Sequence, residues 1–271
     1  MRVDTDPRPP SGSARPPGTA RPQEPRILAR GWRAYAVRPV LLALLCAATA
    51  AFVATRELDS IEQRVLTVDN LSTALVEHVQ LSLVSFGIVI VLAVPVGVLV
   101  TRRYGRWLIP VVTALGNLGQ AVPKIGLLIV LAIMFGLGFK IAVAGLVTGA
   151  VLVVLTNTVT GLLGIDPARL EAARGMGMGP LTVLLRVELP LAVPVIAAGA
   201  RTALTLIVSY GVIAVFVDAG GLGGVLLTGI DVSRISIVFV GAAMSVTLAL
   251  MADWLGWIAE ELLTPRGLSA A

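Results

Sequence analysis

The stretch ALVEHVQLSLVSFGIVIVLAVPVGVLV, residues 74–100, decides the fold class of this protein. Its only acidic residue is Glu77, and it is longer than the roughly 20 apolar residues that one membrane-spanning helix needs. Directly after it come Arg102, Arg103 and Arg106, which form a short basic loop. Short basic loops stay on the cytoplasmic side of a membrane. The stretch therefore predicts a membrane-spanning helix that ends on the cytoplasmic side.

The composition of the whole chain supports a membrane protein. Of the 271 residues, 56% are hydrophobic and only 14% are charged, and the mean hydropathy is +0.92. An ordinary soluble domain has about 25% charged residues. At about 20 residues per span, the length allows about five to seven spans with short loops. This composition excludes most classes of soluble enzyme.

The formal charge of +5 lies in the N-terminal tail. Residues 1–38 contain eight arginines and three acidic residues, whereas the remainder has thirteen basic and thirteen acidic residues. Seven of the sixteen prolines precede Trp32, and a chain so rich in proline and arginine cannot build a packed core. We predict that residues 1–36 form a disordered cytoplasmic tail attracted to anionic lipid. No aromatic residues alternate with these arginines, so no nucleic-acid partner is expected.

Further apolar runs complete an all-α polytopic fold of about six transmembrane helices with cytoplasmic coupling helices. Both termini are expected in the cytoplasm, because the basic segments and the number of crossings agree. Within the first apolar run, Ala48-Thr49-Ala50 resembles a signal-peptidase site, so removal of that run stays open. The segment 106–140 is too long for one straight span and too short for two, so a broken or strongly tilted helix is expected there. The predicted parts are an N-terminal anchor at 37–55, a transmembrane core at 74–263 with spans at 74–100, 106–140, 141–164, 191–217 and 234–263, and a C-terminal tail at 264–271.

The inventory of reactive residues argues against catalysis and metal binding. The only lysines, Lys124 and Lys140, do not stand in a phosphate-binding loop of the Gly-Lys-Ser/Thr type. His78 is the only histidine and Cys46 the only cysteine, so neither a metal site nor an intrachain disulfide is expected. We interpret His78 as a partly solvated residue at the membrane interface. The chain is predicted to have no catalytic residue, no metal and no cofactor of its own.

A polar segment at residues 166–190 separates two of the spans. Asp166 and Pro167 form a good helix start, and the glycines at 175, 177 and 179 end that helix. Pro180 can open a second short helix through Val187, which Pro190 ends where the next span begins. The predicted product is a helix–turn–helix on the cytoplasmic face. A short helix with small exposed side chains suits a groove on a partner protein, although an ordinary connector stays open on physical grounds alone.

The same segment resembles the EAA signature of the integral membrane subunits of ATP-binding-cassette (ABC) importers. In that family this loop docks into a groove of the cytoplasmic ATPase, so the resemblance implies an ATPase partner that uses ATP and magnesium. It implies that this chain itself is a transport subunit and not an enzyme. The matching residues, which the resemblance assigns to ATPase coupling, are Glu171, Ala172, Ala173, Gly177, Leu189 and Pro190.

A wider set of motifs is similar to the permeases for osmoprotectants, that is for glycine betaine, choline, carnitine or proline. The resemblance implies transport by alternating access, a second permease subunit in a homo- or heterodimer, and an extracytoplasmic substrate-binding protein. Lys124 and Asp218 depart from that pattern, at positions where a small residue and a glycine are expected. The motifs are 119–123 (GQAVP), 156–158 (TNT), 187–190 (VELP), 198–203 (AGARTA), 220–223 (GGLG) and 264–267 (TPRG).

Several polar residues of the spans are candidates for the translocation pathway. Ionisable groups at membrane depth are costly and suggest function, but snorkelling of Lys124 to the interface and interhelical hydrogen bonds of the amides are open alternatives. Arg201 and Asp253 are predicted to pair between helices. Clustered glycines permit close approach, so residues Gly220, Gly221, Leu222 and Gly223 are hypothesised to form an outer gate or docking loop. The pathway candidates are Asn117, Gln120, Pro123, Lys124 and Asn157.

Three other functions compete with an osmoprotectant importer. One is an ABC permease for another small solute, such as an amino acid. Another is an ion-coupled secondary transporter, which needs paired carboxylates in mid-membrane, where Asp253 is the only candidate. The last is a membrane scaffold that does not transport.

Overall fold

The computed structural model describes residues 33–264, apart from the side chains of residues 33–35 and of Gln120. Every regular element in that range is helical, which confirms the predicted all-α class. Of the predicted tails, residues 1–32 and 265–271 lie outside the described residues. Residues 33–36, predicted as part of a disordered tail, instead form the first turn of a helix. The elements are α2 (Arg33–Ala54), α3 (Ser60–Val65), α4 (Val68–Thr101), η1 (Arg106–Leu108), α5 (Ile109–Ala121), α6 (Lys124–Phe135), α7 (Phe139–Leu163), α8 (Pro167–Gly175), α9 (Pro180–Val183), η2 (Leu184–Glu188), α10 (Leu189–Gly211), η3 (Val212–Val217), α11 (Leu222–Asp231) and α12 (Ile235–Leu263).

Five helical segments of the described chain are long and apolar enough to cross a membrane. A sixth crossing comes from α5 and α6 if they are counted together, because the two helices form one apolar pair with a 99° bend between them. The prediction of about six spans is therefore confirmed. The expected break in the segment 106–140 is also confirmed, since Val122 and Pro123 separate the two helices.

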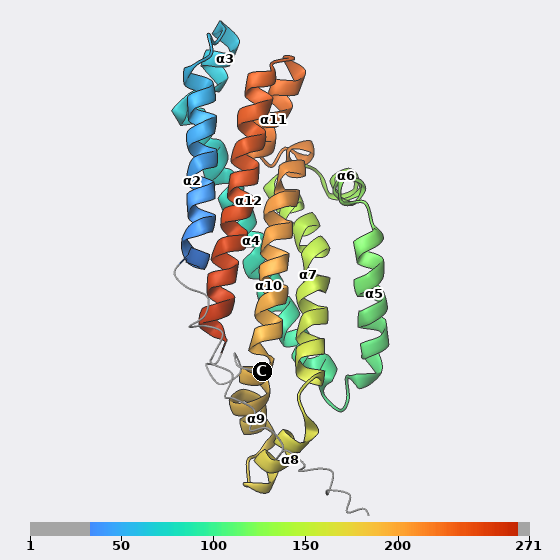
Figure 1. Ribbon diagram of the computed structural model, residues 1–271. Coiled ribbons are helices and arrows are strands. Elements are labelled where there is room, and N and C mark those ends of the chain that lie inside the picture. Colours follow the sequence, from blue (N-terminus) through green and yellow to red (C-terminus); the bar gives the residue numbers. More distant parts are fainter. Residues whose placement is uncertain (1–32, 265–271) are drawn as a thin grey trace, which may run out of the picture.

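The long helices lie side by side in one bundle whose two ends differ (Figure 1). The short helices α8 and α9 lie at one end, called here the α8 end, and α3, α6 and α11 lie at the other, called the α11 end. Helix α5 runs from the α8 end to the α11 end, where α6 turns across it. The segment between α4 and α7 thus traverses the bundle once, as the count of crossings required.

Helix α7 is the centre of the bundle. It packs against α4 and α10, and it also contacts α5 and α6, while α10 packs in turn against α12. Glycines bring these helices close together: a Cβ on Gly97 of α4 would lie 2.6 Å from Cγ2 of Thr158 in α7. A Cβ on Gly199 of α10 would lie 2.5 Å from Cβ of Asn157. Small residues at such contacts let backbones approach and gain dispersion energy where lipid supplies no hydrophobic drive.

Helix α2 lies at the edge of the bundle and packs mainly against α12. None of its most apolar window is buried inside the chain. Near its start, Nη1 of Arg38 donates to Oδ2 of Asp253 at 3.1 Å, and its guanidinium lies 5.5 Å from the ring centre of Trp257. Near its end, the rings of Phe52 and Phe239 lie 4.5 Å apart. Contacts at both ends therefore attach α2 to the surface of α12.

The prediction that Pro190 ends a short helix is wrong. From Pro180 to Val217 the chain forms one continuous helical segment, which includes the π turn η2. In that turn the N–H of Leu189 donates to the carbonyl of Leu184, one residue further back than in an α-helix. Proline lacks an N–H and its ring crowds the preceding turn, and a widened π turn directly before Pro190 accommodates both defects.

Candidate functional site

The segment predicted to couple to an ATPase projects from the α8 end of the bundle (Figure 1). Asp166 caps α8, since its carboxylate accepts from the N–H of Ala168 at 2.9 Å, and Pro167 occupies the first turn. Asp and Pro are well suited to these two positions because one accepts a free N–H and the other lacks one. The local sequence thus explains why a helix begins here directly after α7.

The two alanines of the EAA stretch face different surroundings. Glu171 and Ala172 are exposed, whereas Ala173 is only 2% exposed. The expectation that both alanines are exposed is therefore wrong for Ala173. Helix α8 contacts α9 and the π turn η2, and Ala173 is its buried residue.

Gly177 provides a turn that no ordinary residue adopts readily. Its φ is +80°, and its N–H donates to the carbonyl of Arg174 at 2.9 Å. No atom lies within 4 Å of the position that a Cβ would occupy. The backbone at Gly177 is therefore open to another molecule. Leu189 and Pro190 differ from it, since both are partly buried at the base of α10.

An ion pair that the sequence reasoning missed holds this base together. Nη2 of Arg102, at the end of α4, donates to Oε2 of Glu188 in the π turn. The side chain of Glu188 is only 9% exposed, and Nε of Arg102 also donates to the carbonyl of Val98. Glu188 stands within the VELP motif, next to an apolar helix. A charged residue in that position could have indicated an ion pair. The pair connects α4 to the segment between α8 and α10.

The pathway candidates do not converge on one point. Asn117 is exposed on α5. Asn157 instead lies between α7 and α10, where its amide Nδ2 donates to the carbonyl of Val153 at 2.8 Å. Pro123 is exposed at the bend between α5 and α6, and the side chain of Gln120 lies outside the described part of the chain. The amide at 157 is used within its own helix.

Lys124 has a local partner. Its Nζ donates to the carbonyl of Gly119 at 2.6 Å, and its aliphatic stem lies beside Gly149 of α7. Among residues 33–264 no carboxylate pairs with it. A cation at the last carbonyls of a helix is stabilised by the helix dipole. Lys124 therefore caps the C-terminal end of α5 where the chain bends.

Arg201 and Asp253 form a bidentate ion pair between α10 and α12. Nε of Arg201 lies 2.7 Å from Oδ1 of Asp253, and Nη2 lies 3.0 Å from Oδ2. Nη1 lies 3.4 Å from Oε2 of Glu260, and Arg38 of α2 joins at Asp253. Two arginines and two carboxylates thus neutralise one another, which is the structural interpretation that the sequence suggested.

The glycine-rich loop at the α11 end is packed and not free. Asp218 adopts the left-handed conformation with φ 57° and ψ 43°, which glycine adopts more readily than aspartate and which fits the glycine that the resemblance led us to expect there. Gly220 and Gly221 have φ values of +73° and +83°, and the N–H of Gly221 donates to Oε2 of Glu77 at 2.8 Å. Leu222 is fully buried, as is Gly223 within α11. The loop is therefore seated against α4.

His78 is fully buried, so its interpretation as a partly solvated interfacial residue is wrong. Its Nε2 donates to the carbonyl of Val208 at 2.9 Å, while Nδ1 has no hydrogen-bond partner in the described chain. Gly211 and Gly221 lie so close that a Cβ on either would come within 3.3 Å of the imidazole. These glycines make room for the ring, and no feature of the local sequence indicated that.

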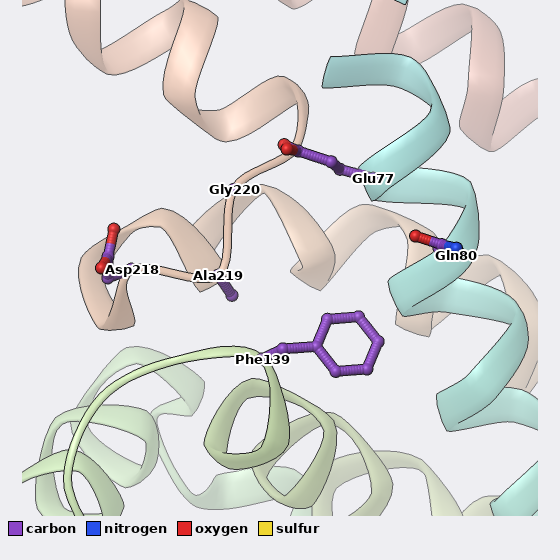
Figure 2. A pocket seen from close by; sticks show the side chains of 6 residues that line it. All are labelled: Glu77, Gln80, Phe139, Asp218, Ala219 and Gly220. Carbon is purple, nitrogen blue, oxygen red and sulfur yellow. The ribbon is translucent and has the colours of Figure 1, made fainter. Parts of the chain in front are cut away.

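A cavity of about 330 Å³ lies beside the glycine-rich loop (Figure 2). Glu77 and Gln80 of α4 border it from one side, and Asp218 follows η3 on another. The ring of Phe139, at the start of α7, lies below the loop. Two carboxylates, an amide and an aromatic ring suit a small cationic or zwitterionic group better than an anion.

Comparison with known proteins gives one consistent family. A family model described as "Binding-protein-dependent transport system inner membrane component" matches residues 93–261. The chain is 34% identical over 193 residues to the choline transport system permease protein OpuBB of Bacillus subtilis, covering 71% of this chain and 88% of OpuBB. It is 35% identical over 216 residues to the osmoprotectant import permease protein OsmW of Salmonella typhimurium, covering 78% of this chain and 100% of OsmW.

Solved structures show the same arrangement. A chain of the MetNI methionine ABC transporter in an inward-facing conformation superimposes with a TM-score of 0.62 and 26% sequence identity. The superposition covers 72% of this chain and 96% of that one.

Proposed function

Because the chain belongs to the family of binding-protein-dependent transport system inner membrane components, we propose that it imports an osmoprotectant such as glycine betaine, choline, carnitine or proline. The family assignment confirms the resemblance drawn from the EAA stretch, and it makes the chain a multi-pass permease of the inner membrane. In this proposal transport occurs by alternating access, and a separate ATPase hydrolyses ATP with magnesium.

The observation that carries the proposal is α8 with the turn that follows it. Helix α8 is held to the base of the bundle on the side of Ala173, and it leaves Glu171 and Ala172 exposed. Gly177 adds an open backbone with positive φ. A rigid helix with small exposed side chains that is held on one side can transmit a movement of a partner protein to α10. Helix α10 continues from the same segment. We assign Glu171, Ala172, Ala173, Gly177, Leu189 and Pro190 to this coupling.

In this proposal each end of the bundle is assigned to one side of the membrane. The α8 end, with Arg102, Arg103 and Arg106 in the short loop after α4, is assigned to the cytoplasm by the positive-inside rule. The α11 end faces outward and is the docking side for a substrate-binding protein. A second permease subunit completes the pathway in a two-fold or pseudo-two-fold pair.

The cavity in Figure 2 supports a zwitterionic or cationic solute. Glu77 and Asp218 place negative charge at the outward end, and Phe139 adds an aromatic face. Quaternary ammonium groups are attracted both to carboxylates and to aromatic faces. This agrees with relatives whose names refer to choline and carnitine.

The test is uptake of radiolabelled solutes in a strain that lacks its own osmoprotectant transporters and expresses this chain with its cognate ATPase and binding protein. We expect saturable uptake of at least one of glycine betaine, choline, carnitine and proline, abolished by an ATPase that cannot hydrolyse ATP. An assembled transporter that takes up none of the four would contradict the proposed substrate class.

Import of an amino acid is the second candidate, and the likeness to the methionine transporter MetNI favours it. Labelled methionine and an equimolar mixture of other amino acids in the same assay separate the two candidates. Uptake of methionine with no uptake of the quaternary amines would replace the osmoprotectant assignment and leave the permease assignment intact.

A further inference from the structure

A second cavity, of about 460 Å³, lies at the α8 end between the loop after α4 and the base of α8. Four arginines line it, and Glu188 is the only acidic residue among the lining residues. Since Arg102 is already bound to Glu188, the cavity has a surplus of three positive charges. The arginines that supply this surplus are Arg103, Arg106 and Arg174.

These three arginines have no counter-charge within the described part of the chain. Among residues 33–264 none of them makes an ion pair or a side-chain hydrogen bond. They come from two separate segments, because Arg103 and Arg106 follow α4 whereas Arg174 ends α8. Like charges gathered around one cavity repel one another, and an anion bound between them removes that repulsion.

Aromatic side chains beside the cavity indicate that it lies at the depth of the lipid headgroups. The loop that contributes Arg103 and Arg106 also carries Tyr104 and Trp107, which are 89% and 72% exposed. Tyrosine and tryptophan concentrate at the boundary between the apolar membrane core and water. Helix α4 ends at Thr101, immediately before this loop.

One wall of the cavity is apolar. It is formed by Leu162, Leu163 and Leu170, and Leu163 is 44% exposed beside the arginines. A free phosphate ion would gain nothing from such a wall. A phospholipid would place its phosphate among the guanidinium groups and an acyl chain along the leucines.

We propose that this cavity binds the phosphate of an anionic phospholipid headgroup in the cytoplasmic leaflet. Arginine is suited to this task because its planar fork donates two parallel hydrogen bonds to phosphate oxygens. Basic pockets between membrane helices on this side of a membrane favour anionic lipids. Because Arg174 belongs to α8, the bound lipid braces the coupling helix against the end of α4. The site is independent of the solute that the permease carries.

The test measures phosphatidylglycerol bound to the full-length chain in phosphatidylcholine nanodiscs, by native mass spectrometry over a titration of phosphatidylglycerol. The double variant Arg106→Gln/Arg174→Gln removes one cation from each wall, and we expect about a 30-fold loss of affinity. The matched control Arg169→Gln/Arg186→Gln removes two exposed cations from the same end of the bundle but outside the cavity. We expect less than about a threefold loss in the control.

Further measurements distinguish a lipid phosphate from free phosphate, and a specific loss of binding from misfolding. The variant Arg106→Lys/Arg174→Lys keeps both charges and should retain most of the binding, which a misfolded chain would not. Equal losses in the two Gln variants would overturn the proposal, because charge on the whole face would then be responsible. Displacement of the lipid by millimolar inorganic phosphate would overturn the lipid as the source. Unchanged lipid binding with loss of the ATPase subunit from the Arg106→Gln/Arg174→Gln complex would assign the cavity to a protein partner instead.

Discussion

Two glycine-containing turns lie at opposite ends of this bundle, and the sequence marks both as functional, but their surroundings differ. At the α8 end, Gly177 has a φ of +80° and no atom within 4 Å of its missing Cβ. At the α11 end, Gly220 and Gly221 have similar φ values, but they lie directly against Glu77 and His78.

The difference shows that a positive φ alone does not indicate what a glycine is for. Where the missing Cβ points into open space, the glycine leaves a surface for a second molecule. Where it points at another helix, the glycine allows internal packing, and its replacement acts on stability. The open turn is expected to affect transport without affecting folding, and the packed turn is expected to do the reverse.

The largest expected effect is at the open turn. Gly177→Asp should lower ATP-driven uptake about tenfold or more, because the new side chain occupies the surface on which the ATPase would dock. The amount of protein in the membrane should fall much less than uptake, since Asp enters the left-handed region at a cost of only about 1–2 kcal/mol and its side chain meets no neighbour. Uptake and membrane abundance are measured in parallel.

Gly175→Asp is the matched control for that variant. It introduces the same side chain two residues earlier, where again no atom lies within 4 Å but the backbone needs no positive φ. We expect it to retain most of the uptake. Normal uptake by Gly177→Asp would contradict the role of the open turn in docking the ATPase.

The next effect is at the packed end. A Cβ on Gly223 would collide with the backbone carbonyl of Val212, which cannot move aside as a flexible side chain could. Gly223→Ala should therefore destabilise the protein by about 2–3 kcal/mol. Gly224→Ala, one residue later in α11 and with open space around it, should be neutral or stabilising by about 0.5–1 kcal/mol.

Thermal unfolding of the two purified variants in the same detergent tests this pair. The two positions are adjacent in α11, so any general effect of alanine on this helix is the same in both variants. The difference between their melting temperatures therefore reports the local packing. Equal melting temperatures for Gly223→Ala and Gly224→Ala would show that the backbone around Gly223 moves aside without cost. That result would contradict the tight packing assigned to the glycine-rich loop.

A smaller effect comes from the contact that seats the packed loop. Glu77→Gln keeps the shape of the side chain but weakens its hydrogen bond from the N–H of Gly221, which is 2.8 Å long in the native chain. Because Glu77 is exposed to solvent, we expect a loss of only about 0.5 kcal/mol. Glu57→Gln, outside this contact, is the control, and hydrogen exchange of the segment around Gly221 should increase only in Glu77→Gln.

The smallest effect depends on pH and also lies at the α11 end. Asp59 caps α3, and hydrogen bonds from the backbone N–H of Glu62 and from Nε of Arg234 lower its pKa below the ordinary value near 3.8. A lowered pKa stabilises the fold above the unfolded pKa, and this contribution is lost as the pH falls through the folded pKa. The melting temperature should therefore fall slightly more for the native chain than for Asp59→Asn when the pH drops below about 4. An identical pH dependence in the two proteins would contradict the role of Asp59.

The sequence could predict those features that depend on composition and on local motifs. Long apolar runs between basic loops determine the number of spans and the expected side of each loop, because the membrane penalises polar residues wherever they stand. The break after α5 could be predicted because Pro123 has no backbone N–H to donate in a helix. The helix start at Asp166 and Pro167 was readable for the same local reasons, and the EAA spacing pointed to the family that the comparisons then showed.

Only the tertiary structure decided which side of each helix is buried and which distant residues meet. It separates exposed Ala172 from buried Ala173, and it buries His78 against Val208, a residue 130 positions away. It also places Arg174 and Arg103 around one cavity, although α5, α6 and α7 separate them in the sequence. The physical reason is that an apolar helix in a membrane shows no polar face to mark its buried side, so its neighbours and not its own pattern determine its orientation.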